Sequence, residues 1–568
     1  MNKMNILSIH YGHDSSACIL KDGEIVLYFK EERFSREKRD RVPFTSIKKC
    51  IENFNEEITF IVITSTEFNP IFGFVTKFIQ TLIDTTKTPI INFTSYHHLT
   101  HVGTSFFNSG FEESIVVVVD GRGSSYKDQV AECESIYLMS YENGLKPIIK
   151  NYFIPSYMNF NALEEDTYNE IINNPHKCNI SNKNGGIVNI YTTATLLIGQ
   201  NMEEGGKVMG LSSYGEKIKD FPKLFVDDYG RTDDSHYEIY QYWNGMEMPI
   251  FKEHHGKLTK KITKENYKFY ADYAYEIQTQ SQEAVGNLIE KSIEKTGVKK
   301  VCISGGYGMN IVANHYYLQR FPDVEFYFEP IADDTGGAIG AAKMVWYFET
   351  KDQTIRPIKT TSFHGIHYDV SEYKGKTTEV EDIAKLLHED KSVAVYTGLA
   401  EAGQRALGNR SILFNALNPD AKNLVNKIKK REWYRPFACM VLEEDANQYF
   451  EMGRIKSSPF MTICFPVRPE YVKIIPGVTH VDNTCRIQTV SQSDGYLYQL
   501  LREFKNLSGH GIVLNTSFNL AGEPLVETPE DAFNTLDNSS LDYLWFEETK
   551  QLFKSDYNTH ENTSNTNK

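Results

Sequence analysis

A repeated pattern of apolar runs and tight turns constrains the fold of this chain most strongly. Residues 4–9 form an apolar run, and the segment 17–29 (ACILKDGEIVLYF) holds the pair Asp22-Gly23 between two apolar stretches. Asp-Gly between such runs is a strong hairpin signal. The pattern recurs at 115–120 (IVVVVD), which leads into a Gly-rich turn and a second hairpin with its turn at Glu142-Asn143-Gly144. Two such units predict a duplicated α/β fold.

The periodicity after the second unit predicts one long helix and two strand-to-helix turns. Apolar residues at mixed spacings of 3 and 4 predict a helix over 265–297, with Gly297 at its C-terminal end. Gly-rich turns follow at 304–308 (SGGYG) and 333–337 (DDTGG), each between a strand and a helix. Backbone N–H groups at such a turn can bind phosphate, although tight strand-to-helix packing explains the glycines equally well. Neither turn fits a P-loop.

The apolar periodicity fades between Asp352 and Ser362, so we expect a domain boundary there. The chain is therefore divided into a first unit at 1–357, a second α/β unit at 358–556 and a polar tail at 557–568, which is expected to be disordered. The predicted fold class is mixed α/β throughout.

Composition and charge narrow the classes of function. The 568 residues include 60 Lys+Arg and 75 Asp+Glu, a net charge of −15, which argues weakly against duplex nucleic acid as a partner. The longest central aliphatic run is too short for a membrane span, and the N-terminus has no apolar signal segment. The eight cysteines include no Cys-x-x-Cys pair. A cytoplasmic protein with buried thiols is expected.

A histidine pair gives the sharpest chemical signal in the chain. His97 and His101 are four residues apart, so a helix would place both imidazoles on one face. Asp120 ends the Val-rich strand, and Asp334 lies in a Gly-rich loop. Two imidazoles and two carboxylates suit Fe(II), Mn(II) or Zn(II) better than calcium. The alternative is a helix with exposed histidines, and His98 falls on another face.

Cationic motifs are concentrated in the second half of the chain. The run 429–437 (KKREWYRPF) interleaves cations with aromatic residues, so part of it should be buried. Buried arginine needs a partner, and an anionic ligand is a natural one. Two further arginines lie in 404–411 (QRALGNRS), and short polar side chains follow a strand at 515–519 (NTSFN). These segments predict a phosphate or carboxylate site.

The sequence resembles the carbamoyltransferase family that includes the nodulation-factor, cephamycin and tobramycin carbamoyltransferases, over nearly the whole chain. The resemblance rests on motifs that occur in the same order, at residues 12–17, 31–36, 96–101, 206–211, 304–310, 405–411, 431–438, 479–482 and 515–519. This chain departs from the pattern where relatives often have Pro in the turn before Arg405, and where Cys439 replaces Pro. No proposed ligand is lost.

The resemblance implies an N-terminal ASKHA-type domain, similar to actin-like ATPases and sugar kinases, and a C-terminal YrdC-like domain. It implies that the second domain cleaves carbamoyl phosphate and forms carbamoyl-adenylate with ATP, with Mg as the expected companion of ATP. The intermediate would pass internally to a metal site in the first domain, with iron in the best-known case. There the carbamoyl group would be transferred to a substrate hydroxyl.

The resemblance also implies roles for individual residues. Metal ligands would be His97, His101, Asp120 and Asp334, with Asp334 preferred to Asp333 by the pattern Asp-x-Gly. Carbamoyl phosphate and ATP would contact Lys429, Arg431, Arg435, Arg486, Ser517 and Asn519. The adenylate in the first domain would contact Gly305, Gly306, Asn310 and Gly336. Candidates for the catalytic base are His13, Asp14 and His98.

The acceptor is expected to be a small hydroxylated molecule such as a sugar, an antibiotic or another secondary metabolite. A hydroxymethylated nucleobase or nucleotide is the alternative within the same chemistry. A non-catalytic ASKHA nucleotide-binding module and a simple sugar kinase are alternatives from other classes. A kinase would release ADP, whereas adenylate formation releases pyrophosphate and then AMP. The sequence leaves the acceptor, the metal and the oligomeric state open, a homodimer included.

Overall fold

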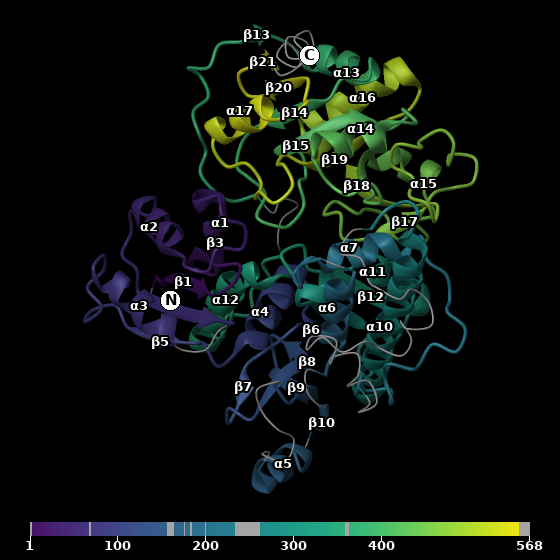
Figure 1. The fold of residues 1–568 in the computed structure, drawn as a ribbon. Helices are drawn as coiled ribbons and strands as arrows, with labels where there is room; N and C mark the ends of the chain where they lie inside the picture. The colour runs from purple at the N-terminus through teal and green to yellow at the C-terminus, as the bar shows by residue number, and fades with distance from the viewer. Residues whose placement is uncertain are drawn as a thin grey trace, which may run out of the picture. The chain divides into compact units, whose positions relative to one another are not determined.

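The computed structural model describes residues 3–66, 70–155, 164–174, 176–181, 185–198, 200–232, 262–357 and 363–555 (Figure 1). The predicted tail at 557–568 and the junction residues 358–362 lie outside these ranges. The chain forms two compact units. The first contains Met1–Val26 and Arg41–Ile358, and the second contains Leu27–Asp40 and Lys359–Lys568. The mixed α/β class is confirmed.

The first sheet of the first unit has the strand order β3-β2-β1-β4-β5. Its strands are β1 (Asn5–Tyr11), β2 (Ser16–Lys21), β3 (Glu24–Lys30), β4 (Phe60–Ser65) and β5 (Ile90–Asn92). The predicted hairpin turn is confirmed, with positive φ at both Asp22 (48°) and Gly23 (89°). Strand β1 is antiparallel to β2 and parallel to β4, so a meander is extended by parallel strands.

The second sheet repeats this arrangement in the order β10-β9-β8-β6-β11-β12. Its strands are β6 (Glu113–Val119), β7 (Ser125–Tyr126), β8 (Val130–Ser140), β9 (Gly144–Phe153), β10 (Lys177–Ser181), β11 (Lys300–Ser304) and β12 (Glu325–Phe328). Strand β6 pairs antiparallel with β8 and parallel with β11. A three-stranded meander followed by parallel strands thus occurs twice, which confirms the predicted duplicated α/β fold.

The two sheets are joined through a pair of helices that cross at very close range. Helix α4 (His97–Ser109) packs on β6 and β11, α12 (Gly337–Thr350) packs on β1 and β2, and the two helices pack on each other. A Cβ atom added at Gly340 would lie 1.7 Å from the carbonyl oxygen of Thr100, and one at Gly103 would lie 2.3 Å from that of Gly340. Only glycine permits this backbone-to-backbone contact.

The remaining helices of the first unit complete its outer layers. They are α2 (Phe44–Glu52), α3 (Pro70–Gln80), α5 (Glu165–Ile172), α6 (Ile187–Leu197), α7 (Gly205–Ser212), α10 (Tyr267–Thr296) and α11 (Ile311–Arg320). Helix α10 confirms the long predicted helix, and it ends at Gly297 with φ 72°. Within the described ranges, no helix combines the length and apolar character needed to cross a membrane.

The second unit is built on a nine-stranded sheet of order β13-β21-β20-β14-β15-β19-β16-β18-β17. Its strands are β13 (Lys376–Thr377), β14 (Val393–Tyr396), β15 (Arg410–Asn415), β16 (Ala438–Leu442), β17 (Cys464–Pro466), β18 (Thr484–Val490), β19 (Ile512–Ser517), β20 (Tyr543–Phe546) and β21 (Gln551–Lys554). Its helices are α1 (Glu31–Ser35), α13 (Val380–His388), α14 (Ala421–Ile428), α15 (Ala446–Tyr449), α16 (Tyr496–Ser508) and α17 (Pro529–Asp537). Helices α13 and α16 bury Leu387 and Phe504 with Trp545 of the sheet.

The crossing of α4 and α12 generates a stability prediction. Gly340→Ala should lower the free energy of unfolding by about 1–3 kcal/mol, because overpacking outweighs the gain in helix propensity. The matched control is Gly206→Ala in α7, where an added Cβ meets nothing within 4 Å. Its effect should stay within about 1 kcal/mol. Urea unfolding followed by circular dichroism measures both, and equal effects would contradict the account.

Candidate functional site

Helix α4 positions two imidazoles at its first turns. It begins at His97, so His101 lies one turn further along on the same face. The two Nε2 atoms are 3.3 Å apart, and both side chains are 1% exposed. On the far side of the His101 ring, Nδ1 is 3.5 Å from Ser304 Oγ at the end of β11, which orients this ring. The predicted alternative of exposed histidines is wrong.

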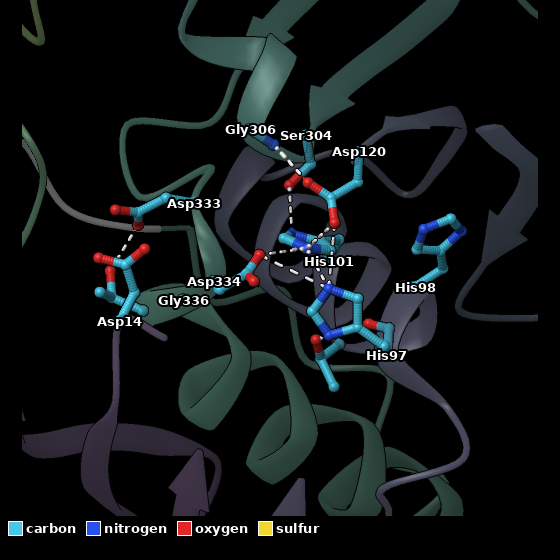
Figure 2. A network of polar contacts seen from close by, with 12 residues as sticks. Asp14, His97, His98, His101, Asp120, Ser304, Gly306, Asp333, Asp334 and Gly336 are labelled. Atoms are coloured by element: carbon cyan, nitrogen blue, oxygen red, sulfur yellow. Dashed lines mark hydrogen bonds and ion pairs between the residues drawn. The ribbon is translucent and has the colours of Figure 1, made fainter. Parts of the chain in front are cut away.

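Two carboxylates complete this group from different elements (Figure 2). Asp120 follows β6, and its Oδ2 lies 3.2 Å from His97 Nε2 while its Oδ1 accepts the N–H of Gly306 at 3.0 Å. Asp334 lies in the turn before α12, with Oδ1 at 3.5 Å from His97 Nε2 and 3.3 Å from His101 Nε2. All four side chains are buried, and four donor atoms lie within 4.8 Å of one another.

The donor spacing fits one shared metal ion. Ligand atoms bound to an ion at about 2.0–2.2 Å lie about 3–3.5 Å from one another. Three of the four imidazole-to-carboxylate distances fall between 3.2 and 3.5 Å, and the fourth, from Asp120 Oδ2 to His101 Nε2, is 4.0 Å. The predicted donors therefore lie together, and the set of two imidazoles and two carboxylates matches a first-row divalent ion.

The charges of the group are strongly coupled. Burial lowers the pKa of His97, but the carboxylates of Asp334 and Asp120 outweigh burial and raise it to about 10. Burial and the neighbouring Asp334 raise the pKa of Asp120, yet His97 and His101 hold it at about 2. The neighbouring histidines thus keep both carboxylates, Asp120 and Asp334, ionised.

Backbone contacts explain the glycines near this group. Gly305 has φ +84°, and a Cβ there would lie 2.4 Å from the carbonyl oxygen of Val119. This contact brings the next N–H, that of Gly306, onto Asp120. A Cβ at Gly336 would lie 2.4 Å from the carbonyl oxygen of Ile331. These glycines place the backbone around the donors, and an adenylate contact at Gly305, Gly306 and Gly336 remains a prediction.

Asn310 is occupied within the fold. Its side chain caps α11 by accepting the N–H of Ala313 at 3.1 Å, and it exchanges two hydrogen bonds with Gln278 at 3.0 and 3.2 Å. Both the oxygen and the nitrogen of its side-chain amide thus have partners within the protein. A contact between Asn310 and adenylate stays a prediction.

The three predicted catalytic residues lie in different places. His13 bridges two carboxylates, with Nδ1 at 3.1 Å from Asp14 Oδ2 and Nε2 at 3.2 Å from Asp334 Oδ2, and its side chain is 40% exposed. Burial lowers the pKa of His13, but Asp334 and Asp14 raise it to about 9. Asp14 has the unusual positive φ of 62° in the β1–β2 turn. The pair His13–Asp14 therefore borders the donor group.

His98 points away from the donor group (Figure 2). Its Nδ1 lies 2.7 Å from Ser135 Oγ and 3.5 Å from Glu132 Oε2. Burial and the ammonium of Lys150 hold its pKa well below the usual value. His98 thus belongs to a buried polar network on β8 and β9.

One buried histidine near the donors is not signalled by a motif. His10 of β1 is 0% exposed, and its ring centroid lies 6.1 Å from that of His97. Burial lowers the pKa of His10 to about 3, against the opposing effect of Asp334. Nothing in the sequence indicates that His10 lies near the donors, because it is part of an apolar strand in which a neutral imidazole can be buried. The alternation of side chains along β1 could have indicated only the face of the sheet on which His10 lies.

The second unit contains a separate cationic site. Lys429 follows α14, and its ammonium contacts the backbone and side-chain oxygens of Ser517 and Asn519. Ser517 Oγ in turn donates to Asn519 Oδ1 at 2.6 Å. Burial, followed by the positive charges of Arg431 and Arg435, holds the pKa of Lys429 well below the usual value. The three residues that sequence reasoning grouped here do lie together.

Arg431 and Arg435 lie near this lysine, and Arg486 lies near these two arginines. Burial and then Arg435 and Arg486 lower the pKa of Arg431, and burial lowers that of Arg486 to about 10. Arg431 stacks on Phe437 with its guanidinium carbon 4.1 Å from the ring centroid. Arg486 lies in β18, between Ala438 and Cys464 of the neighbouring strands. A cluster of positive charge at this depth favours a bound anion.

The chain matches two family models and several curated proteins. The models described as Carbamoyltransferase N-terminus and Carbamoyltransferase C-terminus match residues 73–343 and 384–551. An uncharacterized protein of Synechocystis is 29% identical, with 94% of each chain covered. Nodulation protein NolNO of Sinorhizobium fredii is 28% identical, covering 94% of this chain and 78% of that protein. Nodulation protein U of Rhizobium tropici is 32% identical over 44% of this chain and 43% of its own length.

The donor group generates a metal-binding prediction. His101→Ala should weaken binding of Fe(II) by more than about 100-fold, because it removes one of four donors. His98→Asn should leave the metal content unchanged, because His98 contacts Ser135 instead. Anaerobic reconstitution with Fe(II) followed by elemental analysis measures both. Stoichiometric iron in His101→Ala would contradict the proposed donor set.

Proposed function

The chain belongs to the carbamoyltransferase family, and from this premise we propose that it is an ATP-dependent O-carbamoyltransferase for a small hydroxylated acceptor. In the proposed reaction, the second unit forms carbamoyl-adenylate and the first unit transfers the carbamoyl group. The observation that carries the proposal is that one chain contains two sites suited to ligands of opposite charge. One unit gathers donors for a cation, and the other gathers cations for an anion.

In the second unit, carbamoyl phosphate is first cleaved by water to carbamate and phosphate. A carbamate oxygen then attacks the α-phosphorus of ATP, a new P–O bond forms, and the bond to pyrophosphate breaks. Lys429, Arg435 and Arg486 are proposed to neutralise the phosphates during both steps. Ser517 and Asn519 orient the ammonium of Lys429, as their four oxygen contacts indicate. Mg bound to ATP would accompany these steps.

In the first unit, the acceptor hydroxyl oxygen attacks the carbamoyl carbon, and the bond from that carbon to AMP breaks. The products are the carbamoylated acceptor and AMP. The hydroxyl proton is proposed to go to the Asp14 carboxylate, which lies 3.1 Å from the His13 imidazole beside the donor group. His98 is a less suitable base because Ser135 and Glu132 occupy its Nδ1 side.

The donor group is proposed to hold a divalent ion, Fe(II) before Mn(II) or Zn(II). His97, His101, Asp120 and Asp334 would be its protein ligands. When bound, such an ion supplies Lewis-acid polarisation of a phosphate or carbonyl oxygen. Ser304 and Gly306 would orient two of the ligands through His101 Nδ1 and Asp120 Oδ1.

Pyrophosphate release tests this proposal without any acceptor. The full chain supplied with ATP should release pyrophosphate only when carbamoyl phosphate is present. Arg435→Ala should reduce this release by about 100-fold or more, because the guanidinium neutralises phosphate charge in the transition state. Arg435 is 33% exposed, so truncation should not disrupt the fold. Exposed Arg502 of α16 offers the matched control, Arg502→Ala. Release of ADP without pyrophosphate would contradict the proposal and favour a kinase.

A further inference from the structure

The segment Glu31–Arg36 carries a motif of the sequence to which the proposed reaction assigns no role. It lies within Leu27–Asp40, which belongs to the second unit although the rest of that unit begins at Lys359. Helix α1 ends at Ser35, and its C-cap residue Arg36 has the left-handed φ of 60° and donates its N–H to the carbonyl of Glu32. A segment from the N-terminal part of the chain thus belongs to a unit whose other residues lie in the C-terminal part.

The guanidinium of Arg36 binds two backbone carbonyls of the loop 518–526. Its Nη1 donates to the carbonyl of Leu525 at 2.7 Å, and its Nη2 donates to that of Pro524 at 3.0 Å. Its Nε lies 3.4 Å from Asp531 Oδ1. The other oxygen of Asp531 caps α17 by accepting the N–H groups of Glu527 and Thr528. One side chain therefore fastens the loop to the start of α17.

The end of β19 and the start of the same loop carry the residues that contact Lys429. Ser517 and Asn519 contact its ammonium, and Asn519 Nδ2 also donates to the carbonyl of Glu523 at 2.7 Å. The N–H of Val526 donates to the carbonyl of Phe518 at 3.1 Å, which closes the loop. A shift of Pro524 and Leu525 would therefore be transmitted across the loop to Lys429.

Arg33, in the same segment, supports a second loop of the unit. Its Nη2 donates to the carbonyl of Glu401 at 3.1 Å, and the side chain is 5% exposed. The carboxylate of Glu401 accepts the N–H groups of Leu407, Asn409 and Arg410 at 2.7–3.2 Å. Lys38 adds positive charge nearby, since it contributes to the lowered pKa of Lys429 after burial and the two arginines.

We infer that Arg36 is a positioning residue of the anion site in the second unit. Its fork fixes the loop 518–526, and the loop fixes Ser517 and Asn519 against the ammonium of Lys429. The inference rests on the proposed function in that carbamoyl phosphate is the anion used by the reaction. The placement of the loop itself is independent of which anion is bound.

The kinetic test compares Arg36→Gln and Arg36→Lys with the unchanged full chain. Arg36→Gln removes the charge and the two-carbonyl fork, so the KM for carbamoyl phosphate in pyrophosphate release should rise by about 10-fold or more. Arg36→Lys keeps the charge and can reach one carbonyl, so it should recover part of this loss. Glu37→Gln, at an exposed neighbouring position, is the matched control and should keep the KM.

A purely structural role would reduce the amount of active protein and leave the KM unchanged, and that result would overturn the inference. Calorimetric titration with inorganic phosphate, without ATP, separates this inference from the proposed function. Weaker phosphate binding by Arg36→Gln, by about 10-fold, would support the inference even if the unchanged chain released no pyrophosphate. Equal phosphate binding, or none by the unchanged chain, would overturn it. If Arg36→Gln fails to fold, Arg36→Lys carries the same comparison.

Discussion

The backbone contact between α4 and α12 is the constraint on which the first unit depends. Gly103 and Gly340 bring the two helices together at a distance that no side chain would allow. The two imidazoles lie in the first turns of α4, and Asp334 begins the short 3-10 turn that leads into α12 at Gly337, so the crossing of the helices also sets the spacing of the donors. Thr104 reinforces it by donating to the carbonyl of Gly336 at 2.8 Å. The packing of the unit and the geometry of its site therefore have one origin.

The two units contain polar clusters that favour ligands of opposite charge. In the first, two carboxylates and two imidazoles are buried together, and each carboxylate stays ionised because of the positive charge beside it. In the second, the buried ammonium of Lys429 lies among neutral oxygens, and the partly buried Arg431 and Arg435 repel it. An isolated buried charge is costly, so each cluster is best satisfied by a ligand of the opposite sign. That complementarity supports the proposed two-step carbamoyl transfer.

Local sequence patterns predicted those parts of the structure that depend on neighbours along the chain. The spacing of His97 and His101 followed from the helical period, and Asp22-Gly23 followed from hairpin chemistry. The choice of Asp334 over Asp333 needed the family resemblance, because spacing treats the two alike. The structure places Asp334 beside the imidazoles, whereas Asp333 accepts a hydrogen bond from Thr335.

Features that depend on distant parts of the chain could not be predicted in this way. The spacing of His98 put it on another face, but only the fold shows that Ser135 binds it. Residues 31–36 stand out in the sequence only as a motif of the family resemblance, and nothing local indicates that Arg36 binds a loop nearly the length of the chain away.

The most direct test of the central claim is pyrophosphate release by variants that damage one site at a time. His101→Ala should still release pyrophosphate from ATP in the presence of carbamoyl phosphate, because the proposed reaction uses its donor group only in the transfer step. Lys429→Met should release none, because it lacks the buried ammonium of the anion site. Loss of release in His101→Ala, with release retained in Lys429→Met, would contradict the division of the reaction between the two units.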